Sequence, residues 1–451
     1  MTFNDLNLGK ALNNALGDLG MTEPTTIQAK TFPLIMSGKD IIGIAQTGTG
    51  KTFAYLLPAL RLWKFTKTSY PQILIIVPTR ELVAQVIEEV EKLTTYMTFT
   101  AVGVYGGTNI KTHKHAISLG CDLVVGTPGR LNDLLLDGVL KAKLIKTLII
   151  DEVDEMLNLG FRVQLHTIKE FLPEKRQNLM FSATLIPQVE TVIQEYTTYY
   201  DKVEVAPSGA PLESIDQSCY SIPNFNSKTN LLIHLLEQNA DMTKVLVFAS
   251  TKKMADILYD RLYPIFEETI GVIHSSKSQN NRFQTVEFFQ DGTYRCIIAT
   301  DIIARGLDVS SVTHVINFDL TDTPEKYIHR IGRTGRADKR GVAISFVSEQ
   351  ELEYREQIEA LMQLPIQEVP VPEEVELSDE LIDLEKPVDF VPFNNHKMKK
   401  FVPSGPAFHE KKDKNKKENR HMTRSMTQKL KYKKPKKRGQ KSINNKKKKK
   451  K

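Results

Sequence analysis

This sequence has few cysteines and no long apolar run. Its 451 residues include only three cysteines, Cys121, Cys219 and Cys296, which lie far apart and form no Cys-x-x-Cys pair. Their number excludes a disulfide-rich framework and their spacing argues against a metal site, so we expect buried free thiols in a reducing cytoplasm. No apolar run approaches the length of a membrane span, and Met1 to Lys10 lacks the basic-then-apolar pattern of a signal peptide. We therefore expect a cytoplasmic protein with no membrane partner.

Acidic residues are scarce in one part of the chain, its C-terminal end. The whole sequence has 61 Lys+Arg and 54 Asp+Glu, a net charge of +7. From Lys397 to Lys451 there are 24 Lys+Arg and 3 Asp+Glu (net +21), and the rest has 37 Lys+Arg and 51 Asp+Glu (net −14). Charge of one sign and low apolar content predict a tail that is disordered when alone and binds a polyanion, most simply nucleic acid.

Hydrophobic patterning predicts an α/β fold with mostly parallel sheets. The chain is 41% apolar and 25% charged, typical of a globular protein, and its length predicts two or three domains. Short apolar runs alternate with longer helical patterns, which is the signal of βαβ units. In the first half the expected strands are Ile41–Ala45, Ile73–Val77, Leu123–Gly126, Thr147–Ile150 and Leu179–Phe181. In the second half they are Val245–Phe248, Gly271–Ile273, Cys296–Ile298, His314–Phe318 and Val342–Phe346.

Each strand expected in the first half is followed at once by a polar or Gly/Pro-containing signature. The signatures are Gln46–Thr52, Pro78–Leu82, Thr127–Arg130, Asp151–Asp154 and Ser182–Thr184. Ligands of open α/β sheets bind outside the carboxyl ends of the strands. The five signatures therefore predict one crowded functional edge.

The residues from Ala45 to Thr52, Ala-Gln-Thr-Gly-Thr-Gly-Lys-Thr, predict a phosphate-binding loop. A glycine-rich loop between a strand and a helix binds phosphate through backbone N–H groups, and the lysine and threonine that follow reach the outer phosphates and Mg²⁺. Ala45 stands where the usual pattern has glycine, and it is small enough for the same turn. A chance Gly/Thr loop is the alternative, which Gly-Lys-Thr at this offset after a strand disfavours.

Two carboxylates, Asp151 and Glu152, end another apolar run. Asp151 suits second-shell Mg²⁺ binding, and Glu152 suits orientation and deprotonation of an attacking water. An Asp-Glu pair at a strand end is usually structural, but the phosphate loop favours the catalytic interpretation. Asp154 is expected to hold the site together by hydrogen bonds.

Far along the chain, the segment from His329 to Arg336 places three arginines at intervals of three. Arg330, Arg333 and Arg336 would share one side of a helical turn. The phosphate loop lacks an obvious cation for the charge that develops on a leaving phosphate, and these arginines offer one. A basic nucleic-acid-binding loop is the alternative. If both segments form one site, ATP hydrolysis requires two domains to close.

With these motifs, the chain resembles a DEAD-box ATP-dependent RNA helicase of superfamily 2, of the bacterial type with a basic C-terminal tail. The resemblance spans roughly Phe3 to Val347, about three quarters of the chain, with every motif in order. Pro24-Thr25-Thr26-Ile27-Gln28 and Phe3 match the family's adenine-recognition motif, in which Gln28 would bind the adenine edge and Phe3 would pack on the ring. The defining tetrapeptide reads Asp-Glu-Val-Asp, because Val153 replaces the usual alanine.

The resemblance implies roles for further residues. ATP would be bound by Phe3, Gln28, Ala45, Gln46, Thr47, Gly48, Thr49, Gly50, Lys51, Thr52, Gly306 and Asp308, and Mg²⁺ by Thr52 and Asp151. Catalysis would involve Lys51, Asp151, Glu152, Arg333 and Arg336. RNA phosphate and sugar would be contacted by Thr79, Arg80, Gly107, Thr127, Arg130, Thr251, Gln279, Arg282, Thr300 and Arg305. Hydrolysis would be coupled to strand separation through Asp154, Ser182, Thr184, His329 and Arg330, of which His329 and Arg330 would contact the tetrapeptide.

The family further implies two tandem RecA-like domains, each a mostly parallel sheet flanked by helices. We expect an ATP-binding domain over residues 1–205 with the adenine motif at about 1–29, a linker at 206–216 and a helicase domain over 217–365. An acidic linker at 366–395 and a disordered Lys-rich tail at 396–451 would follow.

The expected function is RNA-stimulated ATP hydrolysis that separates short RNA duplexes. An ATP-gated RNA clamp has the same motifs and stays open as an alternative, and the adenine motif disfavours a DNA helicase. RNA is the expected partner, together with ribosome or RNA-decay assemblies. The tail would tether RNA without sequence specificity, or else act as a solubilising or ribosome-associating segment.

Overall fold

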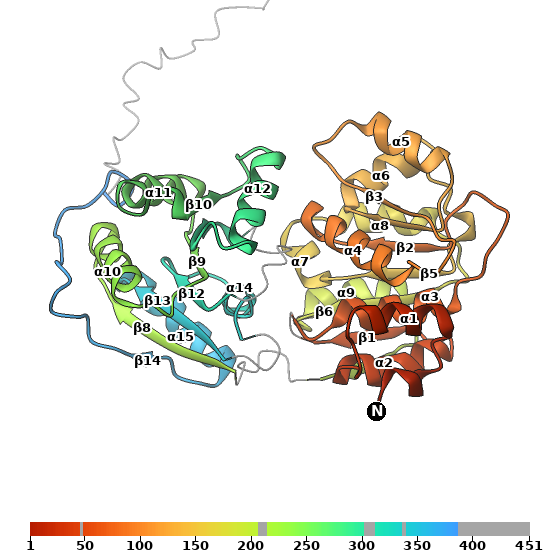
Figure 1. Ribbon diagram of the computed structural model, residues 1–451, viewed down its shortest axis with the longest axis horizontal. Coiled ribbons are helices and arrows are strands. Elements are labelled where there is room, and N and C mark those ends of the chain that lie inside the picture. Colours follow the sequence, from red (N-terminus) through yellow and green to blue (C-terminus); the bar gives the residue numbers. More distant parts are fainter. Residues whose placement is uncertain (46–47, 206–213, 302–311, 336–339, 387–451) are drawn as a thin grey trace, which may run out of the picture. The chain divides into compact units, whose positions relative to one another are not determined.

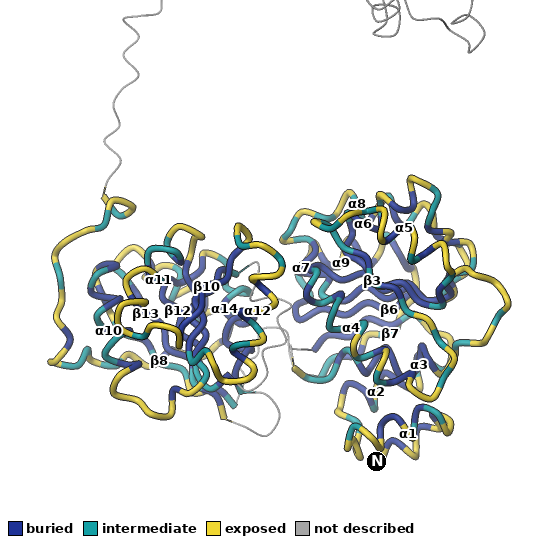
Figure 2. The backbone as a smooth tube through the Cα atoms, turned by 45° about the horizontal axis from the view of Figure 1, so that its top comes forward, coloured by how far each residue is buried: buried dark blue, intermediate teal, exposed yellow. Residues whose placement is uncertain are grey.

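The computed structural model describes residues 1–45, 48–205, 214–301, 312–335 and 340–386. These residues form two parallel sheets, each flanked by helices, as the sequence predicts (Figure 1). The central strands are buried, and most exposed positions lie on the helices, loops and outer strands around them (Figure 2). Within the described residues we find no helix with the length and apolar character needed to cross a membrane.

The first sheet has seven strands among the described residues, in the order β3-β4-β2-β5-β6-β1-β7, with every pair parallel. Their bounds are β1 Ile41–Ile44, β2 Ile73–Ile76, β3 Ala101–Val104, β4 Leu123–Gly126, β5 Thr147–Ile150, β6 Gln177–Ser182 and β7 Asp201–Glu204. All five strands expected in this half are present. The two outermost strands, β3 and β7, are additional. Strand β3 is a short apolar run that is only half-buried, and β7 reads Asp-Lys-Val-Glu and gives no apolar run.

Helices cover both faces of this sheet. One face packs against α1 (Lys10–Asp18), α2 (Thr26–Met36), α3 (Lys51–Leu62) and α4 (Arg80–Leu93). The other packs against helices from α5 to α9, whose bounds are α5 Ile110–Ser118, α6 Pro128–Leu136, α7 Val153–Asn158, α8 Arg162–Phe171 and α9 Pro187–Tyr196. Two short 3-10 helices, Phe3–Leu6 and Ala142–Leu144, complete this half. Because both faces are covered, the central strands β2, β5 and β6 are mostly apolar.

The second sheet also has seven strands among the described residues, in the order β10-β11-β9-β12-β13-β8-β14, again all parallel. The bounds are β8 Ile215–Ser221, β9 Val245–Phe248, β10 Ile270–Ile273, β11 Cys296–Ala299, β12 His314–Asn317, β13 Gly341–Val347 and β14 Gln367–Glu368. The five expected strands are present, and β8 and β14 are additional. Strand β8 reads Ile-Asp-Gln-Ser-Cys-Tyr-Ser, in which polar residues hide the strand signal.

The second sheet is flanked by α10 (Phe225–Gln238) and α11 (Lys252–Phe266) in one cluster, with α12 (Gln279–Gln290) in a second. A third cluster joins the sheet to α14 (Pro324–Ile331) and α15 (Leu352–Met362). Short 3-10 helices lie at Glu267–Thr269 and Glu349–Glu351.

All three cysteines are buried free thiols, as expected, and burial raises the pKa of Cys121 and Cys296 to about 12.

The segment predicted as an acidic linker differs from the expectation. Strand β14 pairs with β8, so the sheet extends beyond residue 365. Further on, the side chains of Asn224 and Asn226 donate hydrogen bonds to the backbone carbonyls of Ser378 and Glu380. Residues 366–386 therefore pack on the second half despite their acidic composition. Their backbone carbonyls accept hydrogen bonds from the N-terminal end of α10, and the side chain of Val375 is buried. The first predicted linker, 206–216, also ends inside β8, and residues 206–213 lie outside the described part.

Candidate functional site

The loop between β1 and α3 has the backbone of a phosphate site. Gly48 and Gly50 adopt φ angles of 81° and 88°, which glycine reaches without strain, and Gly50 caps the N-terminus of α3. A Cβ atom on Gly50 would lie 2.5 Å from Nε2 of Gln28, so a larger residue would displace the Gln28 amide. The loop thus needs glycine both for its turn and for its contact with the adenine motif.

Gln28 ties the predicted adenine motif to this loop. Its Oε1 accepts a hydrogen bond from the backbone N–H of Thr25 at 3.0 Å, which caps α2. Its Nε2 donates to the carbonyl of Gly50 at 3.0 Å. Gln28 and Phe3 are both buried. Adenine binding by Gln28 stays a prediction. In this structure the side-chain amide of Gln28 donates a hydrogen bond to the phosphate loop.

Lys51 lies at the first position of α3 with its side chain buried. No hydrogen-bond partner for its ammonium nitrogen is found among the described residues. A buried ammonium group without a hydrogen-bond acceptor is unfavourable, although the charges of Asp151, Glu152 and Asp154 lie near it. The site therefore fits a phosphate group, with the N-terminus of α3 as a second source of positive potential.

Asp151 and Glu152 follow β5 directly. Glu152 holds a left-handed conformation (φ 54°), and its N–H donates to Oδ1 of Asp151 at 2.9 Å. Burial, and then the charge of Asp151, raises the pKa of Glu152 to about 7, although Lys51 and Arg333 oppose the shift. Burial also raises the pKa of Asp151. A carboxylate with a pKa near 7 is suited to general-base catalysis at neutral pH.

Asp154 joins three of the segments predicted to couple hydrolysis to strand separation. Its Oδ2 accepts hydrogen bonds from the N–H and hydroxyl of Thr184, both at 3.0 Å, and from the N–H of Ala183 at 3.1 Å. Nε2 of His329, on α14, lies 3.7 Å from the same oxygen. Burial alone would raise the pKa of Asp154, but His329, Lys51 and the Thr184 hydrogen bonds outweigh it and hold the pKa below its usual value.

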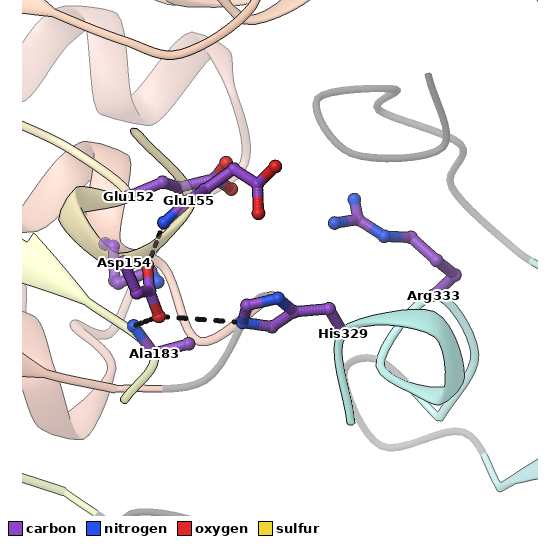
Figure 3. A pocket seen from close by; sticks show the side chains of 7 residues that line it. Glu152, Asp154, Glu155, Ala183, His329 and Arg333 are labelled. Carbon is purple, nitrogen blue, oxygen red and sulfur yellow. Dashed lines mark hydrogen bonds and ion pairs between the residues drawn. The ribbon is translucent and has the colours of Figure 1, made fainter. Parts of the chain in front are cut away.

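A small cavity lies among these residues, and we call it the ATP pocket after the ligand that the sequence predicts there. It is lined by Lys51, Glu152, Asp154, Glu155, Ala183, His329 and Arg333. Figure 3 shows the His329 imidazole and the Arg333 guanidinium pointing toward the carboxylates that follow β5. The two segments that the sequence places far apart, Lys51 with Glu152 and His329 with Arg333, thus line one cavity.

Arg330 differs from its expected position. It makes two bonds to Asp301, from Nε to Oδ1 at 2.5 Å and from Nη2 to Oδ2 at 3.0 Å. Its Nη1 donates to the carbonyl of Asp319 at 2.7 Å. These acceptors lie on the second sheet's own loops, so Arg330 supports the end of α14 in place of contacting the tetrapeptide.

A second, larger cavity of about 570 Å³ gathers many of the predicted RNA contacts, and we call it the RNA hollow. It is lined by Pro78, Thr79, Arg80, Glu81, Gly106, Gly107, Thr127, Gly129, Arg130, Asp133, Leu159, Phe161, Ser275 and Arg282. In this hollow Nη1 of Arg80 donates to Oε1 of Gln279 at 3.1 Å. Glu81 accepts from Nε2 of Gln279 at 3.2 Å and pairs with Arg282.

Two other predicted RNA contacts in the second half lie at carboxyl ends of strands. Thr251 follows β9 and caps α11, since its hydroxyl oxygen accepts from the N–H of Met254 at 3.1 Å. Thr300 follows β11 and is buried. The cap leaves the hydrogen of the Thr251 hydroxyl free to donate to another acceptor.

Known proteins share both halves of the chain. Residues 25–192 match the DEAD/DEAH box helicase family, and residues 227–338 match the helicase conserved C-terminal domain. The DEAD-box ATP-dependent RNA helicase CshA of Geobacillus kaustophilus (strain HTA426) is 38% identical over 351 residues, which cover 78% of this chain and 74% of that protein. The chain belongs to the DEAD-box ATP-dependent RNA helicases. Another relative in this family, the ATP-dependent RNA helicase CshA of Listeria monocytogenes serovar 1/2a, is 37% identical over 370 residues, or 82% of this chain and 70% of that one.

Solved DEAD-box structures have the same architecture. S. cerevisiae Dbp5 bound to RNA and ADP BeF3 superposes with a TM-score of 0.76 at 28% identity, covering 82% of this chain and 96% of that one. The predicted tandem RecA-like fold is therefore confirmed.

Sequence reasoning missed three carboxylates of this DEAD-box protein. Glu155 is buried in the ATP pocket, Glu81 is buried in the RNA hollow, and Asp301 binds Arg330. Glu155 directly follows the tetrapeptide, so extending that motif by one residue would have included it. The roles of Glu81 and Asp301 can be recognised only from the fold, which brings them next to Arg282 and Arg330.

Six predicted site residues lie outside the part of the chain that the structure describes: Gln46, Thr47, Arg305, Gly306, Asp308 and Arg336. Their roles stay predictions from the family resemblance.

Proposed function

We propose that the chain hydrolyses ATP in the ATP pocket and uses the cycle to separate short RNA duplexes held in the RNA hollow. The observation that carries this proposal is the buried Lys51 ammonium, which shares a cavity with Glu152 and Arg333. A cation for phosphate, a base for water and a second cation for developing charge are the groups that phosphoryl transfer needs.

Six residues in the ATP pocket or predicted to lie near it have distinct proposed roles. Lys51 holds the outer phosphates. The Thr52 hydroxyl and the Asp151 carboxylate hold Mg²⁺, which when bound neutralises charge on the phosphate oxygens. Glu152 orients and deprotonates the attacking water, as its pKa of about 7 supports. Arg333 stabilises the charge that develops as the γ-phosphate leaves, and Arg336 is proposed as its companion from the family resemblance.

RNA is proposed to bind through phosphate and sugar. Threonine hydroxyls, arginines and glycine backbone around the RNA hollow provide donors without any base-reading arrangement, so binding would not depend on sequence. The hydrogen bonds of Asp154 to Thr184 and its contact with His329 support a role in coupling hydrolysis to RNA. The three buried thiols support a cytoplasmic location, and ribosome or RNA-decay assemblies are further proposed partners.

Lys51→Ala tests the proposal. We expect ATP turnover to fall to background with and without RNA, because the phosphate loses its buried cation. Lys67→Ala, which changes an exposed lysine of the same half, is the matched control and should behave as the unchanged protein. A strand-displacement assay on a short RNA duplex, beside the lifetime of an RNA complex with a nonhydrolysable ATP analogue, distinguishes unwinding from clamping. ATP turnover that survives Lys51→Ala would contradict the proposed site.

A further inference from the structure

One residue of the RNA hollow, Arg130, is oriented by a buried histidine. His113, on α5, is almost fully buried and packs edge-on against the ring of Tyr105, with ring centroids 5.4 Å apart. Nη1 of Arg130 lies 2.6 Å from Nδ1 of His113. The histidine is not among the residues that the sequence singles out.

This short distance determines the protonation of His113. A guanidinium group has only donors, so Nδ1 must be the acceptor and carries no proton. The imidazole is therefore neutral, with its proton on Nε2. That nitrogen lies 3.4 Å from the hydroxyl oxygen of Thr108, which can accept the proton.

The arginine keeps its charge available while it is held in place. Its second firm bond runs from Nη2 to the backbone carbonyl of Thr108 at 2.9 Å. The carboxylate of Asp133, one turn along α6, lies 3.9 Å from Nε of Arg130 and is largely exposed. Two neutral acceptors thus fix the guanidinium, so its positive charge is only weakly compensated and can attract phosphate.

We propose that His113 is a positioning residue for RNA binding: its neutral imidazole holds Arg130 toward the strand, and protonation of Nδ1 releases Arg130 and weakens the grip. The inference rests on the proposed RNA-binding role of Arg130. Protonation would convert the acceptor into a donor and place two cations side by side, so the contact could not survive it.

The surroundings of His113 set the pH range of this effect. Arg130 of α6 is a charged group that faces the ring, with Asp133 beyond it, and the segment after β3 contributes Tyr105 and Thr108. On α5 itself, Lys111 and Lys114 flank the histidine in sequence, and Lys114 pairs with Asp137. Burial, and then the charge of Arg130, holds the pKa of His113 below its usual value. The neutral form therefore prevails at neutral pH, and RNA affinity should fall as pH drops through this lowered pKa.

The test is the pH dependence of binding to a labelled single-stranded oligouridine, with a nonhydrolysable ATP analogue, in the full chain. His113→Gln keeps an acceptor oxygen but cannot titrate, so it should match the unchanged protein at about pH 8 and hold its affinity at about pH 5.5. His113→Leu removes the acceptor and should weaken binding about fivefold across the range.

Arg130→Ala separates the two levels of the argument. If Arg130→Ala leaves RNA affinity unchanged, the proposed role of Arg130 is wrong. If it weakens binding while His113→Gln keeps the acid sensitivity of the unchanged protein, the inference about His113 is wrong. In the Arg130→Ala background, His113→Gln should have no further effect at any pH, and this cycle decides the matter even if His113→Leu folds poorly.

Discussion

The ATP pocket and the RNA hollow lie at carboxyl ends of strands, but they treat charge in opposite ways. The pocket buries acidic groups beside Lys51 and Arg333, and burial raises the pKa of Asp151 and Glu152. The hollow holds Arg130 with a neutral imidazole and a carbonyl. Carboxyl groups with shifted pKa values suit a site of proton and phosphoryl transfer. An arginine that is held in place by neutral acceptors suits reversible binding of a polyanion.

Glu81 shows where the two regions resemble each other. This buried carboxylate in the hollow pairs with Arg282 and accepts from Gln279, so some of the proposed RNA-binding donors bond to protein in this structure. RNA phosphate would have to replace Glu81 as a partner of Arg282. The comparison therefore predicts that changes in the pocket alter turnover, and changes in RNA-binding charge alter affinity.

Arg333→Ala should give the largest separation of turnover from affinity. Removing the cation proposed to stabilise the leaving phosphate should lower kcat about 10³-fold or more, as for arginine fingers in related phosphoryl transfer. RNA-stimulated phosphate release measures the loss, and RNA binding measured in parallel should change little.

The control for this variant is Arg340→Ala, which changes an exposed arginine of the same half. It should retain turnover. Equal losses from both arginines would mean that the charge of the second half, and not the position of Arg333, is what matters.

Glu152→Gln should lower kcat about 10²–10⁴-fold while the ATP- and RNA-bound state accumulates, because the amide cannot take a proton from water. In the unchanged protein, Glu152 must be ionised to act as the base. Since its pKa is raised to about 7, kcat should increase as pH rises through 7 and fall on the acid side. Initial rates over this range, at saturating RNA, measure the profile.

Glu174→Gln, at an exposed position after α8, provides the matched control and should keep both rate and profile. An acid limb that persists unchanged in the residual activity of Glu152→Gln would assign the titration to another group.

The residues that line the ATP pocket could be predicted from the sequence better than the residues that hold functional arginines in position. Strands such as β2 and β9 were found because both faces are covered and every residue is apolar. Lys51 and Glu152 were found because their spacing from strand ends is short and local. The acceptor of Arg330 could not be found, because Asp301 is 29 residues away in sequence and is brought near only by the fold. His113 was missed for the same reason, since its partner Arg130 lies on a different helix.

The basic tail offers a test of affinity alone. Truncation after Phe390 removes the segment with a net charge of +21. We expect RNA affinity to fall about tenfold at low salt, and its dependence on salt to flatten, because fewer counterions are released on binding. Binding isotherms at several salt concentrations measure both effects, and ATP turnover without RNA should stay the same. An unchanged salt slope would contradict a tethering role.

Val153→Ala should have the smallest effect on function, although it restores the tetrapeptide of the family. The Val153 side chain is fully buried in a core cluster of the first half, so truncating it to alanine leaves a small void. We expect a loss of about 1–2 kcal/mol in the free energy of unfolding and little change in kcat, since Val153 carries no reacting group. Denaturant unfolding and ATP turnover measure the two quantities, and Val163→Ala, at a valine that is 73% exposed, is the control for stability. A large change in RNA-stimulated kcat with unchanged stability would instead place Val153 in the coupling between the pocket and the hollow.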